Sequence, residues 1–338
     1  MDRLASELDF SLADHEDRLV WIFGSSRSGS TWLLRMLSEL DGTVPVDDPH
    51  LGHHLGVWRP IPLAWAAADA EPELTTLNEV KRHRASYFFS DRYEDAWKPA
   101  LRQLIVARFD AQARDALASG SASGMPLVIV KEPGSHVADL LLSLFPSSRM
   151  IFLLRDGRDV VDSWVAAHRP DAWAMREGAF AVAPERRETL VRWLSTVWTY
   201  RTETVQRAYG AHEPSRRVLV RYEDLLEDPT VALERVCATA GVDAKPAELE
   251  QISQRNSYAA VPSADKGADK AIRSAEPGGW RRRMAPAEQR AMHEIMGKKL
   301  TELGYLKPGR AQSRLSPTAE NRCGYVNPVS RTAAAGRD

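Results

Sequence analysis

The 338-residue sequence is poor in cysteine and contains only Cys237 and Cys323. Two thiols are too few for a disulfide framework or for a zinc site with several thiolate ligands, so both classes of protein are excluded. Few cysteines are typical of a reducing compartment, and the polar, acidic residues 1–18 are unlike a secretory signal. We therefore expect a cytoplasmic protein.

The sequence also lacks a long apolar run and an excess of charge of either sign. No stretch of about 18 apolar residues occurs, so no membrane-spanning helix is predicted. The 45 basic and 46 acidic residues leave a net charge of −1, which predicts neither a nucleic-acid partner nor a membrane surface. Hydrophobic residues make up 43% of the chain, enough for a sizeable core.

Short apolar runs alternate with helical patterns along the chain. Strands are predicted at residues 20–24, 127–131, 149–154 and 218–222. Helices are predicted at residues 30–40, 136–145, 158–168, 185–209 and 285–303, after residue 229 and over most of 61–119. Loops are predicted at residues 41–60 and 255–283. This alternation predicts a single P-loop-like α/β domain with a central parallel sheet and helices on both faces. The expected boundaries are a polar lead-in at 1–18, the domain at 19–308 and a disordered tail at 309–338.

The first predicted strand runs into Gly-Ser-Ser-Arg-Ser-Gly-Ser-Thr-Trp, residues 24–32, at the start of a helix. Small residues let the backbone approach an anion, and the helix start offers free N–H groups and the positive end of the dipole. Arg27 adds a fixed charge, and Ser28 and Thr31 add hydroxyl groups. The spacing approaches that of the nucleotide-binding loop G-x-x-x-x-G-K-[ST], but Ser30 replaces the lysine. The sequence therefore predicts an anion-binding loop poorly suited to Mg-ATP, with an ordinary capped turn as the alternative.

A second cluster, Arg-Asp-Gly-Arg-Asp-Val-Val-Asp-Ser-Trp, follows the third predicted strand at residues 155–164. Arg155 would lie at the carboxyl end of a parallel strand, where open α/β sheets bind ligands. Ser163 comes eight residues later and can face the same point. An arginine and a hydroxyl that converge in this way suit a second phosphate. Arg158 and Asp159 are instead expected to form surface ion pairs at the helix start.

Four motifs in this sequence resemble, in order, those of the sulfotransferases that use 3′-phosphoadenosine 5′-phosphosulfate (PAPS). They are S-R-S-G-S-T-W, R-D-G-R-D-V-V-D-S-W, R-Y-E-D-L and G-G-W-R-R-R-M, at residues 26–32, 155–164, 221–225 and 278–284. The resemblance covers about residues 20–304. It implies metal-independent, in-line transfer of a sulfuryl group from PAPS to a hydroxyl or amine of a small-molecule acceptor, with release of the product PAP (3′-phosphoadenosine 5′-phosphate).

The resemblance also implies a set of cofactor-binding residues. They are Arg27, Ser28, Gly29, Ser30, Thr31, Trp32, Arg155, Ser163, Tyr222, Arg273 and Arg281. The loop would hold the 5′-phosphosulfate, and Arg27 would neutralise the leaving oxygen. Arg155 and Ser163 would bind the 3′-phosphate, while Arg273 and Arg281 are further candidates for that phosphate.

The residue that accepts the proton of the acceptor is left open by the resemblance. Cytosolic aryl and steroid sulfotransferases carry Lys-Thr-His where this chain has Lys-Glu-Pro at residues 131–133, so proline replaces their histidine base. Lys131 would still orient the sulfuryl group. The candidate bases are Asp48 first, His50, His53 and His54 next, and then Glu132 and His136. The three neighbouring histidines suggest zinc only weakly, because no thiolate accompanies them, and we expect no metal.

Two other functions stay open on the sequence alone. One is a P-loop kinase or nucleoside triphosphatase, against which the replacement of lysine by Ser30 counts. The other is a catalytically inactive nucleotide-binding module, which the missing Lys-Thr-His base would allow. A small molecule or soluble conjugate is the expected acceptor. The oligomeric state is not specified, a homodimer being the commonest assembly of soluble proteins.

Overall fold

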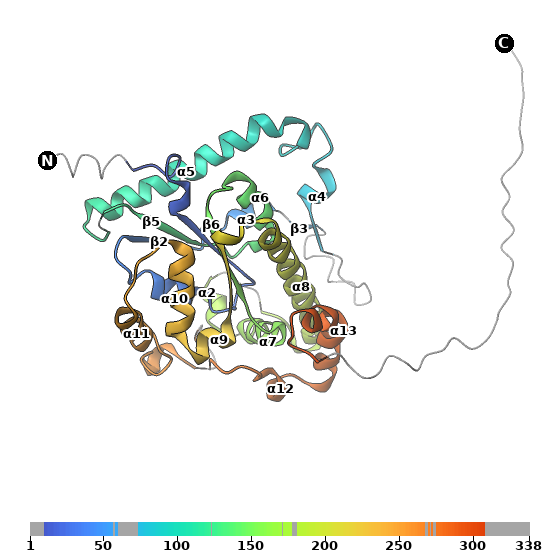
Figure 1. Ribbon diagram of the computed structural model, residues 1–338. Coiled ribbons are helices and arrows are strands. Elements are labelled where there is room, and N and C mark those ends of the chain that lie inside the picture. The colour runs from blue at the N-terminus through green and yellow to red at the C-terminus, as the bar shows by residue number, and fades with distance from the viewer. Residues whose placement is uncertain are drawn as a thin grey trace, which may run out of the picture.

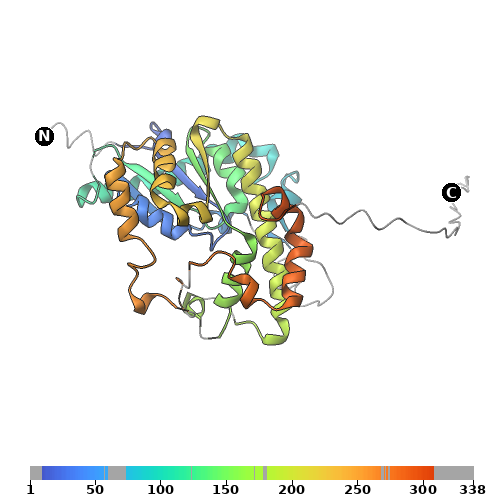
Figure 2. The ribbon, with the colours of Figure 1, turned by 60° about the horizontal axis from the view of Figure 1, so that its bottom comes forward.

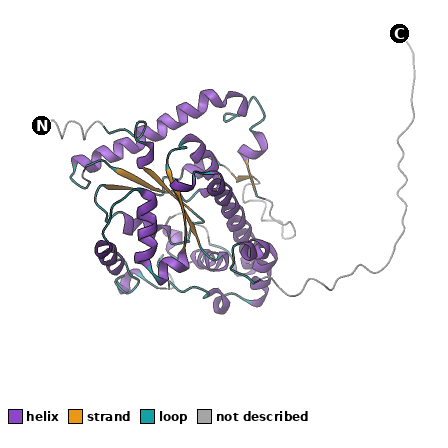
Figure 3. Cartoon of the chain, in the orientation of Figure 1, coloured by secondary structure: helices purple, strands orange, loops and turns teal. Residues whose placement is uncertain are grey.

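The computed structural model of the protein describes residues 10–307, apart from residues 57, 60–73, 123, 171, 178–180, 268–269, 271 and 273–274. Its centre is a parallel sheet with helices packed on both faces (Figures 1 and 3). The predicted fold class, a single α/β domain with a central parallel sheet, is confirmed. Among the helices that the structure describes, none combines the length and the apolar character needed to cross a bilayer.

The order of the strands in the sheet sets the place of the site. The sheet runs β2 (Thr43–Asp47), β5 (Leu127–Lys131), β1 (Leu19–Phe23), β6 (Arg149–Leu154) and β7 (Arg217–Arg221), and each neighbouring pair is parallel. The chain leaves β1 towards β2 and leaves β6 towards β7, so its direction across the sheet reverses between β1 and β6. Open α/β sheets bind ligands at such a switch point, outside the carboxyl ends of the strands.

Helices cover both faces of the sheet, which explains why the strands are apolar along their length. In β1, Leu19, Trp21 and Phe23 face one layer, and Val20 and Ile22 face the other. The first layer holds α5 (Glu94–Ala118), α6 (Ala138–Leu144), α7 (Gly157–Ala167), α8 (Arg187–Ala211) and α13 (Pro286–Glu302). The second holds α2 (Ser30–Leu37), α9 (Tyr222–Glu227), α10 (Pro229–Ala240) and α11 (Pro246–Arg255) (Figure 2).

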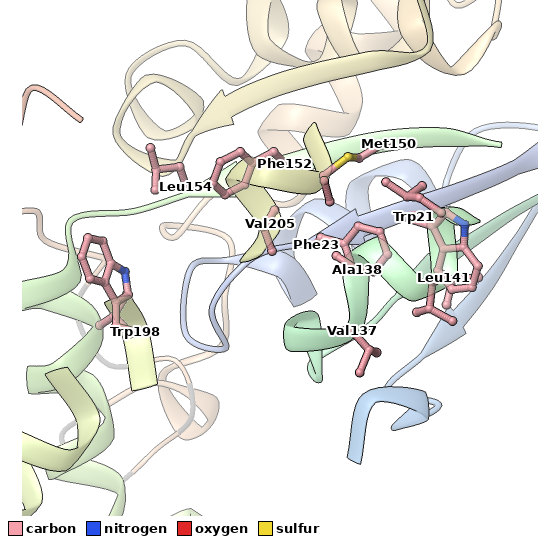
Figure 4. Packing of buried hydrophobic residues seen from close by; sticks show 14 of the residues in the cluster. Trp21, Phe23, Val137, Ala138, Leu141, Met150, Phe152, Leu154, Trp198 and Val205 are labelled. Carbon is pink, nitrogen blue, oxygen red and sulfur yellow. The ribbon is translucent and has the colours of Figure 1, made fainter. Parts of the chain in front are cut away.

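The core of the first layer is built around aromatic side chains of β1 (Figure 4). The Trp21 ring stacks on Phe23 with centroids 5.6 Å apart, and it meets the Phe145 ring at 5.8 Å. Phe10 and Leu12, from the segment predicted as a polar lead-in, are also buried in this core. Residues 309–338, predicted as a disordered tail, lie outside the described residues.

The predicted strands agree closely with the structure. β5 and β6 have the predicted bounds, whereas β1 and β7 each lie one residue earlier. The prediction of a loop over residues 41–60 was wrong, because this segment forms β2 and the short helix α3 (Leu51–Leu55). Pro45 lies within β2, and it is tolerated there because β2 is at the edge of the sheet, where an N–H donor can be missing.

Smaller elements complete the described chain. They are the strand pair β3 (Trp58–Arg59) and β4 (Thr75–Thr76), and the helices α4 (Leu77–Lys81) and α12 (Trp280–Arg283). Helix α12 lies within the predicted loop 255–283, and α11 was not predicted. Helix α12 has four residues and α11 has ten, so each offers few turns over which a periodic apolar pattern could be recognised.

Candidate functional site

A cavity of about 320 Å³ opens at the switch point of the sheet, beyond the ends of β1 and β6. Most of the predicted cofactor-binding residues line it: Arg27, Gly29, Ser30, Thr31, Trp32, Arg155, Ser163 and Tyr222. They come from the loop after β1, the start of α2, the end of β6, α7 and the start of α9. The fold therefore brings the first three of the four sequence motifs together at one place.

The loop that joins β1 to α2 is tightly packed at both ends. A Cβ atom at Gly24 would lie 2.2 Å from the Leu153 carbonyl oxygen of β6. Gly29 has a φ of +92°, and a Cβ atom there would lie 2.6 Å from the Tyr222 ring. Ser28 is buried, and its Oγ has no hydrogen-bond partner among the described residues. We call residues 24–29 the anion-binding loop, after the role that the sequence predicts for them.

Arg27 links the anion-binding loop to α7. Its Nε donates a hydrogen bond to Ser163 Oγ at 3.0 Å, although the two residues lie 136 positions apart. Its guanidinium also lies over the Trp173 ring, 4.9 Å from the centroid. The two residues expected at opposite phosphates of the nucleotide are therefore in direct contact.

Arg155 extends from the end of β6 across the same cavity. Its Nη1 donates to the Arg27 carbonyl oxygen at 2.9 Å, and its guanidinium lies 4.1 Å from the centroid of the Tyr222 ring. Its Nε is buried and has no hydrogen-bond partner among the described residues. Burial raises the pKa of Tyr222, so its hydroxyl is protonated at neutral pH. Arg155 therefore presents a positive charge on a rigid aromatic support.

The rest of the cavity wall is formed by residues that the sequence analysis did not single out. They are Arg35, Leu226, Asn256, Tyr258, Val261, Asp265, Ile272 and Ala275. Trp32 is tied to this wall, because its Nε1 donates to the Asn256 carbonyl oxygen at 2.8 Å. Of these residues, only Arg35 could have been predicted from the sequence, because it lies one helical turn after Thr31 on the same face of α2.

The prediction that Arg158 and Asp159 form surface ion pairs was wrong. Both side chains are buried, at 6% and 1% exposed. Arg158 Nη2 lies 2.7 Å from Asp156 Oδ2, and Asp159 accepts hydrogen bonds from backbone N–H groups of Gly278 and Trp280. The start of α7 is covered by a segment about 120 residues further along the chain, which no local pattern could show.

The structure describes only one of the two further arginines predicted to bind the 3′-phosphate. Arg281 is exposed, its guanidinium lies over the Trp280 ring at 4.7 Å, and it does not line the cavity. Arg273 lies outside the described residues. Arg283 instead reaches α7, with Nη2 2.7 Å from Asp162 Oδ2.

Lys131 connects the start of α2 to the end of β2 and the residue that follows it. Its buried Nζ donates to Thr31 Oγ1 at 2.8 Å and lies 2.5 Å from Asp47 Oδ1 and 3.0 Å from Asp48 Oδ2. Parallel pairing of β2 with β5 places Asp47 directly beside Lys131. Asp48, the first candidate base, therefore shares its lysine partner with Thr31 at the start of α2.

Glu132 and His136 hold the backbone of the neighbouring segment. The Glu132 carboxylate accepts N–H groups of Leu51, Gly52 and Gly134 at 2.9, 3.3 and 2.6 Å, and burial raises its pKa. His136 Nε2 donates to the Gly56 carbonyl oxygen at 2.7 Å, and burial lowers its pKa to about 3. Both candidates are thus engaged in positioning residues 51–56.

The three neighbouring histidines lie around α3. His50 precedes this helix with a φ of +58°, and its ring lies edge-to-face on that of His53 with centroids 5.2 Å apart. Partial burial, and then the charge of Arg201, lower the pKa of His53 to about 4. His54 is exposed. Within the described ranges, no group of three or more His, Cys, Asp and Glu side chains is arranged to hold a metal ion.

Comparison with known proteins adds to this geometry. Residues 20–246 match the sequence profile described as the sulfotransferase family. The crystal structure of mouse sulfotransferase SULT7A1 complexed with PAP has a similar fold, with a TM-score of 0.50, 11% identity, and coverage of 89% of this chain and 93% of that chain. None of the curated proteins matches this chain.

Two further structures have lower TM-scores. The sulfotransferase domain from the curacin biosynthetic pathway is 20% identical, with a TM-score of 0.45 and coverage of 86% of this chain and 98% of that chain. Sulfotransferase STF9 from Mycobacterium avium is 15% identical, with a TM-score of 0.46 and coverage of 89% of this chain and 81% of that chain.

Proposed function

The chain belongs to the sulfotransferase family, and we propose that it transfers a sulfuryl group from PAPS to a hydroxyl or amine of a small-molecule acceptor. The observation that carries this proposal is the shared cavity of Arg27 and Arg155. Two cationic side chains from different motifs suit a nucleotide that carries anionic groups at both its 5′ and 3′ positions.

The residues in the cavity fit such a donor. Arg155, which lines the cavity, and Ser28, which lies in the adjoining loop, each have a buried polar atom (Nε and Oγ) without a hydrogen-bond partner among the described residues, and buried polar groups of proteins are normally satisfied. In the proposed complex, the anion-binding loop, Ser30 and Thr31 hold the 5′-phosphosulfate. Arg155 and Ser163 hold the 3′-phosphate, and Trp32 packs near the adenine.

The proposed mechanism follows from where the charged groups lie. Sulfuryl transfer, like phosphoryl transfer, needs mainly an in-line arrangement and stabilisation of charge on the leaving oxygen. Arg27 and Lys131 supply positive charge beside the loop, and Lys131 is already bound to Thr31. The carboxylate of Asp48 lies 3.0 Å from the same lysine Nζ, and in the proposed mechanism it takes the proton from the hydroxyl or amine that is sulfated.

Calorimetric titration with PAP and ADP tests the donor site. We expect PAP to bind about tenfold tighter than ADP or better, because a 3′-phosphate gains charge-assisted hydrogen bonds to Arg155. Arg155→Met should lower the affinity for PAP to that for ADP. Arg114→Met, at an exposed position of α5, is the control and should bind PAP like the wild type. Equal binding of PAP and ADP by the wild type, or binding only with Mg²⁺, would overturn the proposal.

A further inference from the structure

Arg201 of α8 is a buried cation beside the anion-binding loop that the proposed mechanism does not use. The residue is only 7% exposed, and its Nη1 lies 3.4 Å from Ser26 Oγ, inside the loop. Burial lowers the pKa of Arg201 to about 10, which still leaves the guanidinium protonated at neutral pH. A fixed positive charge therefore lies behind the loop, on the face covered by α8.

The packing of α8 determines where this side chain points. Trp198, one turn earlier on the helix, is 1% exposed and lies against Gly157, where a Cβ atom would be 2.5 Å from the indole. This close contact fixes α8 against the start of α7, directly after Arg155. Residues three apart share a helix face, so Arg201 is directed towards the same end of the sheet.

Glu132, His136 and His53 are close enough to Arg201 to interact with its charge. The Glu132 carboxylate raises the pKa of Arg201, and its oxygens also accept three backbone N–H groups. On the same side, the charge of Arg201 lowers the pKa of His136 and of His53. An anion bound in the loop would stabilise this buried guanidinium, and the guanidinium would in turn stabilise the anion.

We propose that Arg201 is a positioning residue for the 5′-phosphosulfate of the donor. It orients Ser26 at the start of the anion-binding loop and adds positive charge on the side of the loop that faces His53 and His136. The inference rests on the proposed function and deepens it, because it concerns the 5′ end of the same nucleotide.

A pair of ligands separates this role from a merely structural one. Adenosine 3′-phosphate keeps the 3′-phosphate of PAP but lacks the 5′-phosphate. We expect Arg201→Met to weaken the binding of PAP about tenfold, because a positive charge next to the 5′-phosphate is lost. The dissociation constant of adenosine 3′-phosphate should change by less than about twofold. Arg201→Lys should recover part of the PAP affinity. Arg207→Met is the matched control, because Arg207 lies on the same helix with a side chain 60% exposed.

The outcomes distinguish this inference from the proposed function. If the wild type binds PAP no tighter than ADP, the proposed function fails. The inference is overturned, and the proposed function stands, if the wild type prefers PAP to ADP but Arg201→Met binds PAP as tightly as the wild type does. The same holds if Arg201→Met loses affinity for PAP and for adenosine 3′-phosphate by the same factor. Should Arg201→Met fail to fold, Ser26→Ala serves instead. Ser26→Ala should weaken the binding of PAP more than that of adenosine 3′-phosphate. An equal loss of affinity for the two ligands would overturn the inference.

Discussion

Lys131 joins the two halves of the proposed reaction centre. Its ammonium group binds Thr31 on one side and the carboxylates of Asp47 and Asp48 on the other. Of the candidate bases, Asp48 contacts this lysine, whereas Glu132 and His136 bind backbone groups. These contacts separate candidates that the sequence could only rank.

Replacing Asp48 tests its role as the base. We expect Asp48→Asn to lower the turnover of PAPS-dependent transfer by about a hundredfold or more, since general base catalysis contributes about 10²- to 10⁴-fold. The dissociation constant of PAP should stay within about twofold of the wild-type value, because Asp48 contacts Lys131 and not the proposed nucleotide cavity.

Asp47→Asn is the matched control for this experiment. Asp47 binds the same Lys131 Nζ, so its substitution reproduces the loss of one carboxylate beside the lysine. A much smaller loss of turnover is expected for Asp47→Asn. Equal losses in the two variants would show that Asp48 acts only by holding Lys131.

Two elements far apart in the chain are joined by acidic side chains of α7. Asp159 binds the backbone of residues 278–280, Asp162 binds Arg283, and the guanidinium of Arg158 lies over Trp280 at 4.5 Å. The second and fourth sequence motifs are therefore in contact with each other. Through these contacts, the helix that carries Ser163 also positions α12.

Substitution of Asp159 tests this link between the elements. Asp159→Ala leaves the buried N–H group of Trp280 and the partly buried N–H group of Gly278 without this acceptor, so the free energy of unfolding should fall by about 2–3 kcal/mol in denaturant titration. Amide hydrogen exchange in residues 278–284 should become faster. Asp115→Ala, at an exposed position of α5, is the control, and a similar stability for the two variants would contradict the assignment.

At the scale of the whole molecule, the strand order assembles the site. The anion-binding loop follows β1 and Arg155 follows β6, and these two strands are neighbours although more than 100 residues separate them in the chain. On the other side of β1, pairing of β5 with β2 brings Lys131 beside Asp47. A parallel sheet places all these strand ends at one edge, which is why the charged groups converge there.

Global stability should depend on pH through His136, which is buried and neutral in the folded state. Its pKa is about 3 in the folded protein against an ordinary value of about 6.5, so below pH 6.5 the unfolded chain binds a proton that the folded chain does not. Stability contributed by His136 is therefore fully present above pH 6.5 and decreases as the pH falls towards 3.

Denaturant titration at two pH values tests this dependence. From pH 7 to pH 5 the contribution of His136 should fall by about 2 kcal/mol. His136→Gln, which keeps a donor for the Gly56 carbonyl, should reduce this pH dependence. His293→Gln, at an exposed position of α13, should leave it unchanged, and an identical slope in all three proteins would contradict the prediction.

Local patterns in the sequence were enough to determine the fold class and half of the residues that line the cavity. Strands buried on both faces must be continuously apolar, so β1, β5 and β6 are visible without a structure. The anion-binding loop is equally local, because small residues between a strand and a helix meet the steric needs of the turn. The motif around Arg155 follows its own strand in the same way.

Only the tertiary structure decided the burial and partners of the charged residues. Whether Asp159 is a surface or a buried group depends on a segment about 120 residues away that covers it. The contacts of Lys131 with Asp48, and of Arg201 with Ser26, likewise join segments distant in sequence. The energy of a charged side chain depends on its solvation and its neighbours, and both are set when distant elements pack together.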